Sequence, residues 1–280
     1  MRRVLVAALA TLGATPLQAQ TDEVQTLREC AARNVPAHSF VQAAEFGVMQ
    51  DGAAQRRIGA ALAGMRDADG INLNIVVSAP NDVAGTAVLL RQNDAGREDM
   101  RMYLPALQRV RPITGGMANQ GILGTDFSYR DIRDIYGALR EGQAMVLGMG
   151  KIAGKDTQRM ELIPAAEQES PYQRMVVDLD ASSCVVLAVD FESPGRGVTK
   201  RLLGDVDSVT NIGERRLLLR YTMDDLDKGS QTVLKLGLPE YDEDRITRIH
   251  IRLACSSAAR ISELKPQVTE TPVPPPVHRM

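Results

Sequence analysis

Residues 71–92, INLNIVVSAPNDVAGTAVLLRQ, decide the fold, because they show a hydrophobic period of two on both sides of a turn. Apolar residues alternate with Asn72 and Asn74 in the first half, and a second aliphatic run follows Gly85. Such alternation is typical of β-strands, and the Pro, Asn, Asp and Gly residues between the runs indicate a turn. The segment therefore predicts two neighbouring strands.

The same pattern recurs along most of the chain and predicts about ten strands. No strand–helix–strand alternation interrupts them, so we expect one antiparallel sheet in a mainly β (α+β) protein. Besides the opening segment, the runs with this pattern are 39–50, 56–67, 98–106, 143–150, 158–165, 172–180, 183–192, 197–204, 214–223 and 231–238.

A few helices are expected beside these strands, and two segments show a helical pattern. Residues 21–34 have Thr21 as a candidate N-cap and stop signals at their end. After Ser128, apolar residues including Ile132 and Ile135 recur at helical spacing for about three turns.

The segment GILGTDFSYRDI (121–132) is dense in reactive groups and could be read as an active site. Ser128 and Asp131 have the spacing of a capping box, and a carboxylate in the first helical turn is stabilised by the helix dipole. Helix initiation therefore explains the cluster. A metal or acid–base role for Asp126, Asp131 and Asp134 is the alternative.

The chain begins as an exported protein would. Two arginines precede the apolar run Val4–Leu12, and Leu17-Gln18-Ala19 has the pattern of a cleavage site. We therefore expect a signal peptide over residues 1–19, cleaved after Ala19. The Pro-rich residues 264–280 are expected to be a disordered tail. Between them, residues 20–263 are predicted to form one domain.

Composition argues against one class of partner. Without the two arginines of the signal peptide, 31 basic and 35 acidic residues remain, a net charge of −4 that argues against nucleic acid.

Cys30, Cys184 and Cys255 allow one disulfide in an oxidising compartment, with three pairings open.

No catalytic residue, metal site or cofactor site emerges from the motifs. GMGKIAGKDT (148–157) and GGMANQG (115–121) lack the spacing of a phosphate-binding loop and are predicted to be turns. The three histidines show no zinc-ligand spacing, and no G-x-S-x-G elbow is present. We therefore predict a protein that is not an enzyme.

Several strands are apolar on both faces, for example CVVLAV (184–189) and RLLLRY (216–221). Such strands need cover on their second face, yet few helices are available. Twelve methionines and only 4% aromatic residues suggest a pliable apolar cavity, with ordinary core filling as the alternative.

The block from Tyr103 to Asp131, with MYLPALQRVRPI followed by GTDFSYRD, resembles the outer membrane lipoprotein-sorting protein family. The similarity extends from about Ser39 to Cys255, through VSAPNDVAGTAVLLR and AVDFESPGRGVTK, which ends at Lys200. The sequence departs from the family pattern at Met102, at Pro112 and over residues 245–257.

The resemblance implies the half-barrel of the carriers LolA and LolB, a strongly curved antiparallel sheet with a few helices over its concave face. It implies a cavity for the acyl chains of lipids or lipoproteins, and an inner-membrane RND or efflux-type transporter as a partner. The predicted function is that of a periplasmic carrier or chaperone for transfer toward the outer membrane. A regulator like RseB on the same fold and a lipid-ester hydrolase are the alternatives.

The alternation of the strands and the expected helix lid give the candidate lipid-binding residues. They are Leu62, Leu73, Ile75, Leu90, Met102, Leu104, Val146 and Val177 on the sheet, and Phe127, Ile132 and Ile135 in the loop and helix. Their direction depends on register, because a slip of one residue reverses the face.

Overall fold

The computed structural model describes residues 16–35, 39–67, 70–92, 98–137, 142–165 and 170–241. The expectations for the first 15 residues, for Cys255, for the histidines and for the tail lie outside this range. In the described part, no helix is both long and apolar enough to cross a membrane.

The predicted antiparallel sheet is confirmed. Thirteen strands form one open sheet in the order β6-β5-β4-β3-β2-β1-β15-β14-β11-β10-β9-β8-β7, with β6 and β7 at its edges, which is the topology of a half-barrel. The strands are β1 (Phe40–Gln50), β2 (Ala53–Asp67), β3 (Gly70–Ala79), β4 (Ala87–Gln92), β5 (Glu98–Leu104), β6 (Arg109–Pro112), β7 (Gln143–Ile152), β8 (Lys155–Ile163), β9 (Arg174–Asp180), β10 (Val186–Ser193), β11 (Gly197–Gly204), β14 (Arg220–Asp225) and β15 (Ser230–Leu236).

The chain divides into two compact units. Unit 1 contains Phe46–Arg56 and Thr114–Leu238 together with the N-terminal helix. Unit 2 contains His38–Glu45 and Arg57–Ile113, and it continues from Pro239.

Unit 2 is built from the hairpins of β2 to β6. A bulge between Gly59 and Ala60 interrupts the pairing of β2 with β3, and such a bulge bends a strand and increases its twist. Gly64 leaves room for Phe40, whose ring would lie 2.0 Å from a Cβ at this position.

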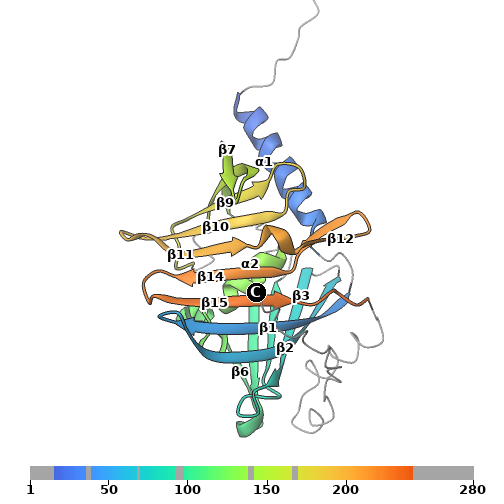
Figure 1. Cartoon of the computed structure of the whole chain (residues 1–280), viewed down its shortest axis with the longest axis vertical. Coiled ribbons are helices and arrows are strands. Elements are labelled where there is room, and N and C mark those ends of the chain that lie inside the picture. The colour runs from blue at the N-terminus through green and yellow to red at the C-terminus, as the bar shows by residue number, and fades with distance from the viewer. Residues whose placement is uncertain are drawn as a thin grey trace, which may run out of the picture. The chain divides into compact units, whose positions relative to one another are not determined.

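Unit 1 holds the two α-helices of the described residues, α1 (Pro16–Arg33) and α2 (Tyr129–Gly137). The first helix runs beside β7 (Figure 1). It begins five residues before the expected Thr21, so the prediction of Thr21 as N-cap is wrong. Proline is favoured in the first turn of a helix because its missing N–H has no partner there in any case.

The expected strand at residues 214–223 is two strands. Residues Arg215–Leu218 form β13, which pairs only with β12 (Val209–Ile212) in a separate hairpin, and β14 follows after Leu219. At the change of sheet, the Leu219 N–H donates to the Ser208 carbonyl, and its carbonyl accepts from Leu236 N–H.

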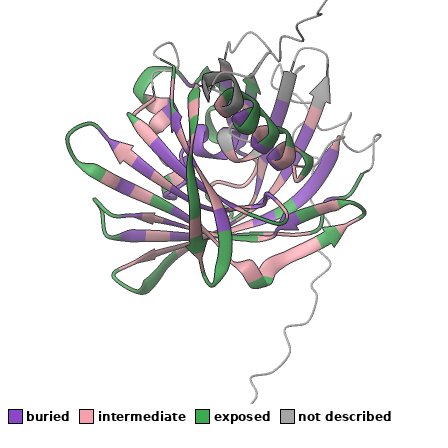
Figure 2. Ribbon diagram, turned by 90° about the horizontal axis from the view of Figure 1, so that it is seen from above, coloured by how far each residue is buried: buried purple, intermediate pink, exposed green. Residues whose placement is uncertain are grey.

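Of the strands predicted to be apolar on both faces, CVVLAV (184–189) is buried on both faces apart from the half-buried Val186. The prediction is wrong for AMVLGM (144–149) in the edge strand β7, where Met145, Leu147 and Met149 are exposed. In β9, all five residues between Arg174 and Asp180 are buried. On one side of β10, Val185 and Leu187 pack against Leu218 of the β12–β13 hairpin, which supplies the cover that helices do not. Buried residues lie in the middle of the strands, and exposed residues lie at the turns (Figure 2).

A disulfide joins Cys30 of α1 to Cys184, just before β10. Of the three pairings left open by the sequence, the structure has this one. It ties the end of α1 to the sheet of unit 1 across 154 residues of sequence.

Candidate functional site

The predicted lipid-binding residues of unit 2 share one face of its sheet. Leu62 pairs with Ile75, and Leu73 pairs with Leu90. Ile75 also pairs with Val88, whose partner on β5 is Met102. Each of these side chains is at most 7% exposed. Leu104 follows two residues after Met102 on the same face and is half-buried.

This register brings together all six candidates of unit 2. The neighbouring residues along the strands point the other way. The cross-strand rows Leu62–Ile75–Val88–Met102 and Gly64–Leu73–Leu90–Met100 are therefore apolar from β2 to β5. The role of these residues in lipid binding stays a prediction.

The two strand candidates of unit 1 also share a face. Val146 pairs with Met160, and Met160 pairs with Val177. The row continues from Val177 through Val189, Leu202, Met223 and Thr232 on successive strands. Val177 is fully buried, whereas Val146, near the edge of the sheet, is half-buried.

Three further candidates come from the loop and helix over this face of unit 1. Phe127 and Ile132 are fully buried, and Ile135 is half-buried. The ring of Phe127 meets the ring of Phe46 edge-on, with centroids 5.9 Å apart. These side chains therefore belong to the packed interior of unit 1.

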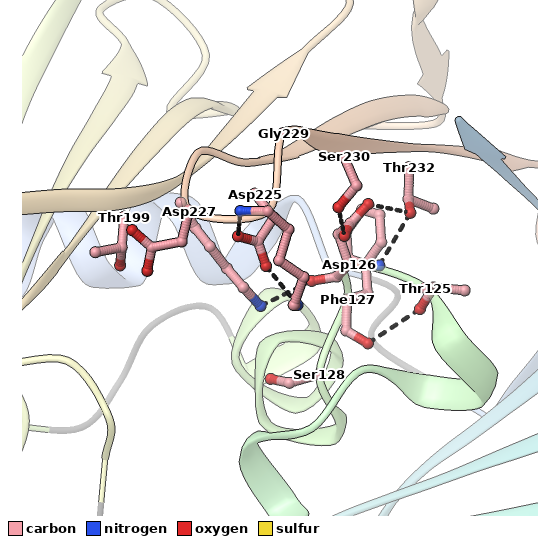
Figure 3. Close-up of polar contacts among 12 residues, drawn as sticks. Thr125, Asp126, Phe127, Ser128, Thr199, Asp225, Asp227, Gly229, Ser230 and Thr232 are labelled. Carbon is pink, nitrogen blue, oxygen red and sulfur yellow. Dashed lines mark hydrogen bonds and ion pairs between the residues drawn. The ribbon is translucent and has the colours of Figure 1, made fainter. Parts of the chain in front are cut away.

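Asp126 fixes the loop to the sheet through four hydrogen bonds. Its carboxylate accepts from the hydroxyls of Ser230 at 2.5 Å and Thr232 at 2.7 Å (Figure 3). Its backbone N–H donates to the Thr232 oxygen at 2.9 Å, and its carbonyl accepts from the Lys200 ammonium at 2.8 Å. Asp126 is 3% exposed, so this anchor lies inside the unit.

The predicted capping box at the start of α2 is present. The Asp131 N–H donates to the Ser128 hydroxyl at 3.0 Å, and the Ser128 N–H donates to the Asp131 carboxylate at 2.8 Å. The same carboxylate accepts from Lys200 and from the Tyr172 hydroxyl, both at 3.3 Å. The cluster therefore starts a helix and also holds it on the sheet.

Asp225 adds a third buried carboxylate near Lys200. Burial alone would raise the pKa of Asp225, but hydrogen bonds from the Lys228 ammonium and backbone N–H, with the charges of Lys228 and Lys200, outweigh it and lower the pKa. The positive charge of Lys200 therefore acts on the carboxylates of both Asp131 and Asp225.

Lys200, Tyr172, Ser230 and Thr232 were not predicted as partners of Asp126 and Asp131. The signal was present in β15, where Ser230, Thr232 and Leu234 alternate at buried positions. A polar residue in a buried register position needs a partner, because a buried polar group without a hydrogen bond is costly.

The polar cluster offers little for catalysis. Its carboxylate oxygens already accept hydrogen bonds from hydroxyl, amide and ammonium groups. Across the described residues, no group of three His, Cys, Asp or Glu side chains could hold a metal ion. GMGKIAGKDT lies in the β7–β8 hairpin and GGMANQG in a short 3-10 helix, so neither is a phosphate-binding loop.

The sequence matches a model of a protein family. A family model described as "Uncharacterized protein" matches residues 72–247, well over half of the chain. No curated protein matches the sequence.

Solved structures resemble the chain over most of its length. A DUF1329 family protein from Desulfovibrio piger has a TM-score of 0.70 at 22% identity, covering 79% of this chain and 93% of that one. A domain described as an outer membrane lipoprotein-sorting protein, from Vibrio parahaemolyticus, has a TM-score of 0.71 at 22% identity, with coverages of 84% and 98%. A LolA superfamily protein from Nitrosomonas europaea has a TM-score of 0.63 at 19% identity, with coverages of 79% and 96%. At these identities the similarity shows a shared fold.

Proposed function

Because the chain belongs to the family whose model matches residues 72–247, and has the fold of outer membrane lipoprotein-sorting and LolA superfamily proteins, we propose that it binds the acyl chains of lipids or lipoproteins. We propose a non-enzymatic carrier or chaperone in the periplasm, acting toward the outer membrane. An inner-membrane RND or efflux-type transporter is the proposed partner.

The observation that carries this proposal is the apolar face of unit 2. Leu62, Leu73, Ile75, Leu90 and Met102 form neighbouring cross-strand pairs with no charged residue between them. Aliphatic and Met side chains adapt to a flexible chain, since Met is unbranched and polarizable. The same contact role is proposed for Leu104, and in unit 1 for Val146, Val177, Phe127, Ile132 and Ile135.

The energetics suit reversible transport. Each buried methylene contributes about 0.8 kcal/mol, so a chain of about 16 carbons gains roughly 13 kcal/mol before costs. Ordering the chain and the protein takes back several kcal/mol. Because a bilayer offers the same chain a similar gain, its release to a membrane needs little net driving force.

The test is a titration of the delipidated protein with a fluorescent fatty acid. Leu89 and Leu90 are consecutive on β4 and point to opposite faces, so Leu90→Gln and Leu89→Gln form a matched pair. The proposal predicts saturable binding in the parent, at least tenfold weaker in Leu90→Gln and nearly unchanged in Leu89→Gln. Melting curves check that both variants fold.

Met102→Gln, on the same face but one strand nearer the sheet edge, replaces Leu90→Gln if that variant does not fold. Absence of saturable binding in the parent contradicts the carrier function. Equal binding by all variants contradicts only the placement of the site.

A further inference from the structure

Unit 1 also contains a cavity of about 240 Å³. It lies on the side of the sheet away from Val177 and the other proposed acyl-chain contacts of this unit. Thr157 pairs with Asp180, and Met160 pairs with Val177. Because side chains alternate along a strand, Lys155 and Asp180 lie on the face opposite to Val177. The cavity lies where the turn after β9 meets the β12–β13 hairpin. It shares no residue with the proposed acyl-chain site.

The walls of this cavity are fixed by the end of α1. The Cys30–Cys184 disulfide and a hydrogen bond from the Asn34 amide to the Ser183 carbonyl hold the turn after β9. The Asn34 side-chain oxygen accepts from the Arg216 N–H of the hairpin. Both walls are therefore tied to one element, which keeps the cavity preformed, as ligand sites usually are.

A second tie comes from Arg215, whose guanidinium donates to the carbonyls of Arg33 and Val35 at 2.8 Å. The hairpin lies beside the end of α1 in Figure 1. The Arg215 side chain is thus engaged in hydrogen bonds at the end of α1, whereas Arg216, the next residue, lines the cavity.

The lining combines an apolar floor with a positive rim. Val185, Leu187 and Val209 are among the floor residues, and Lys155 and Arg216 bring two cations. Neither cation has an ion-pair partner among the described residues.

Asp180, the carboxylate of the lining, is committed to its own turn. One of its oxygens accepts from the N–H and hydroxyl groups of both Ser182 and Ser183. Burial would raise the pKa of Asp180, but these hydrogen bonds outweigh it and lower the pKa. The rim keeps a positive excess even with this ionised group.

We propose that this cavity binds a small amphiphilic anion, a carboxylate or phosphate monoester with a short apolar chain. The anionic group meets Lys155 and Arg216, and the chain covers Val185, Leu187 and Val209. A cavity of about 240 Å³ is slightly smaller than the roughly 300–1,000 Å³ typical of small-molecule sites, which suits a ligand with a short chain.

The experiment is an NMR titration of the folded, disulfide-bonded protein with hexanoate and, separately, butyl phosphate. The proposal predicts saturable shifts in the amides of residues 180–187 and 206–216 with at least one probe, which also identifies the preferred anion. Inorganic phosphate is the control without a chain and should bind more weakly than butyl phosphate.

The double substitution Lys155→Gln and Arg216→Gln should weaken probe binding about tenfold, since an exposed cation contributes a few-fold each. Arg196→Gln, an exposed cation paired with Asp227 on another turn of unit 1, is the matched control and should leave binding unchanged. No saturable shift in these residues overturns the proposal. So does binding that the double substitution leaves intact, or inorganic phosphate binding as tightly as butyl phosphate.

Discussion

The two units differ in what interrupts the apolar face of their sheets. In unit 2, the cross-strand rows Leu62–Ile75–Val88–Met102 and Gly64–Leu73–Leu90–Met100 contain no charged side chain. In unit 1, Lys200, Ser230 and Thr232 stand among the aliphatic residues, and each is bonded to Asp126 or Asp131 of the loop and helix above them.

This difference separates two uses of a sheet face. A buried charge is retained only where it is paired, because removing it from water is otherwise very costly. The polar residues of unit 1 therefore mark where the sheet holds its own loop. The two apolar rows of unit 2 contain no such anchor, and the proposed acyl-chain site is placed there for this reason.

The largest effect is expected for Lys200→Met. This change leaves the Asp131 carboxylate, 1% exposed, without its cation, which should lower the free energy of unfolding by about 3–5 kcal/mol. Arg201, the next residue, forms an exposed ion pair with Asp190 on the other face, and Arg201→Met should cost less than about 1 kcal/mol. Urea denaturation measures both, and equal losses would contradict the anchor.

In unit 2, Leu90→Ala should cost about 3 kcal/mol, because it removes buried methyl groups and leaves a cavity without exposing any polar group. Leu89→Ala, on the half-buried opposite face, should cost about 1 kcal/mol. The same denaturation experiment tests the pair. A larger loss for Leu89 would mean that the two faces have been assigned the wrong way round.

Much of this contrast could be predicted from the sequence. The alternation in INLNIVVSAP and GTAVLLRQ placed Leu73, Ile75 and Leu90 on one face, because a strand has a side-chain period of two and each run spans a single strand. The capping box at Ser128 and Asp131 was also predictable, since both partners lie within three residues.

What could not be predicted depends on contacts between distant segments. The run ERRLLLRYTM has no internal break, so nothing local shows that Leu217 and Leu218 pair with β12 while Tyr221 and Met223 join the main sheet. The bond from Asp126 to Thr232 spans 106 residues and follows from the fold alone.

A smaller effect is expected for Ser128→Ala, which removes the hydroxyl that accepts from the Asp131 N–H. Loss of an N-cap typically costs about 1 kcal/mol. Because the anchor at Asp126 remains, fatty-acid binding per folded molecule should not change. Thermal denaturation and the fatty-acid titration measure the two quantities; lost binding with an unchanged melting curve would make the cluster part of the binding site.

The smallest effect is expected for the stability of the protein at acid pH. The pKa of Asp225 lies below its ordinary value of 3.8, so its contribution to stability is complete above that value and is lost as the pH falls through the lower pKa of the folded protein. Asp225→Asn should remove this component. The free energy of unfolding is measured against pH for the parent and the variant. If the two curves run parallel below pH 4, Asp225 does not contribute to the pH dependence of stability.

The central claim is that acyl chains contact the apolar rows of unit 2. It is tested most directly by cross-linking a photoactivatable fatty acid to the delipidated protein and locating the label by peptide mass spectrometry. The account predicts label on Leu62, Leu73, Ile75, Leu90 or Met102, competed away by unlabelled fatty acid. Label confined to the opposite face of these strands, at residues such as Leu89 or Arg101, or label that fatty acid does not displace, would contradict it.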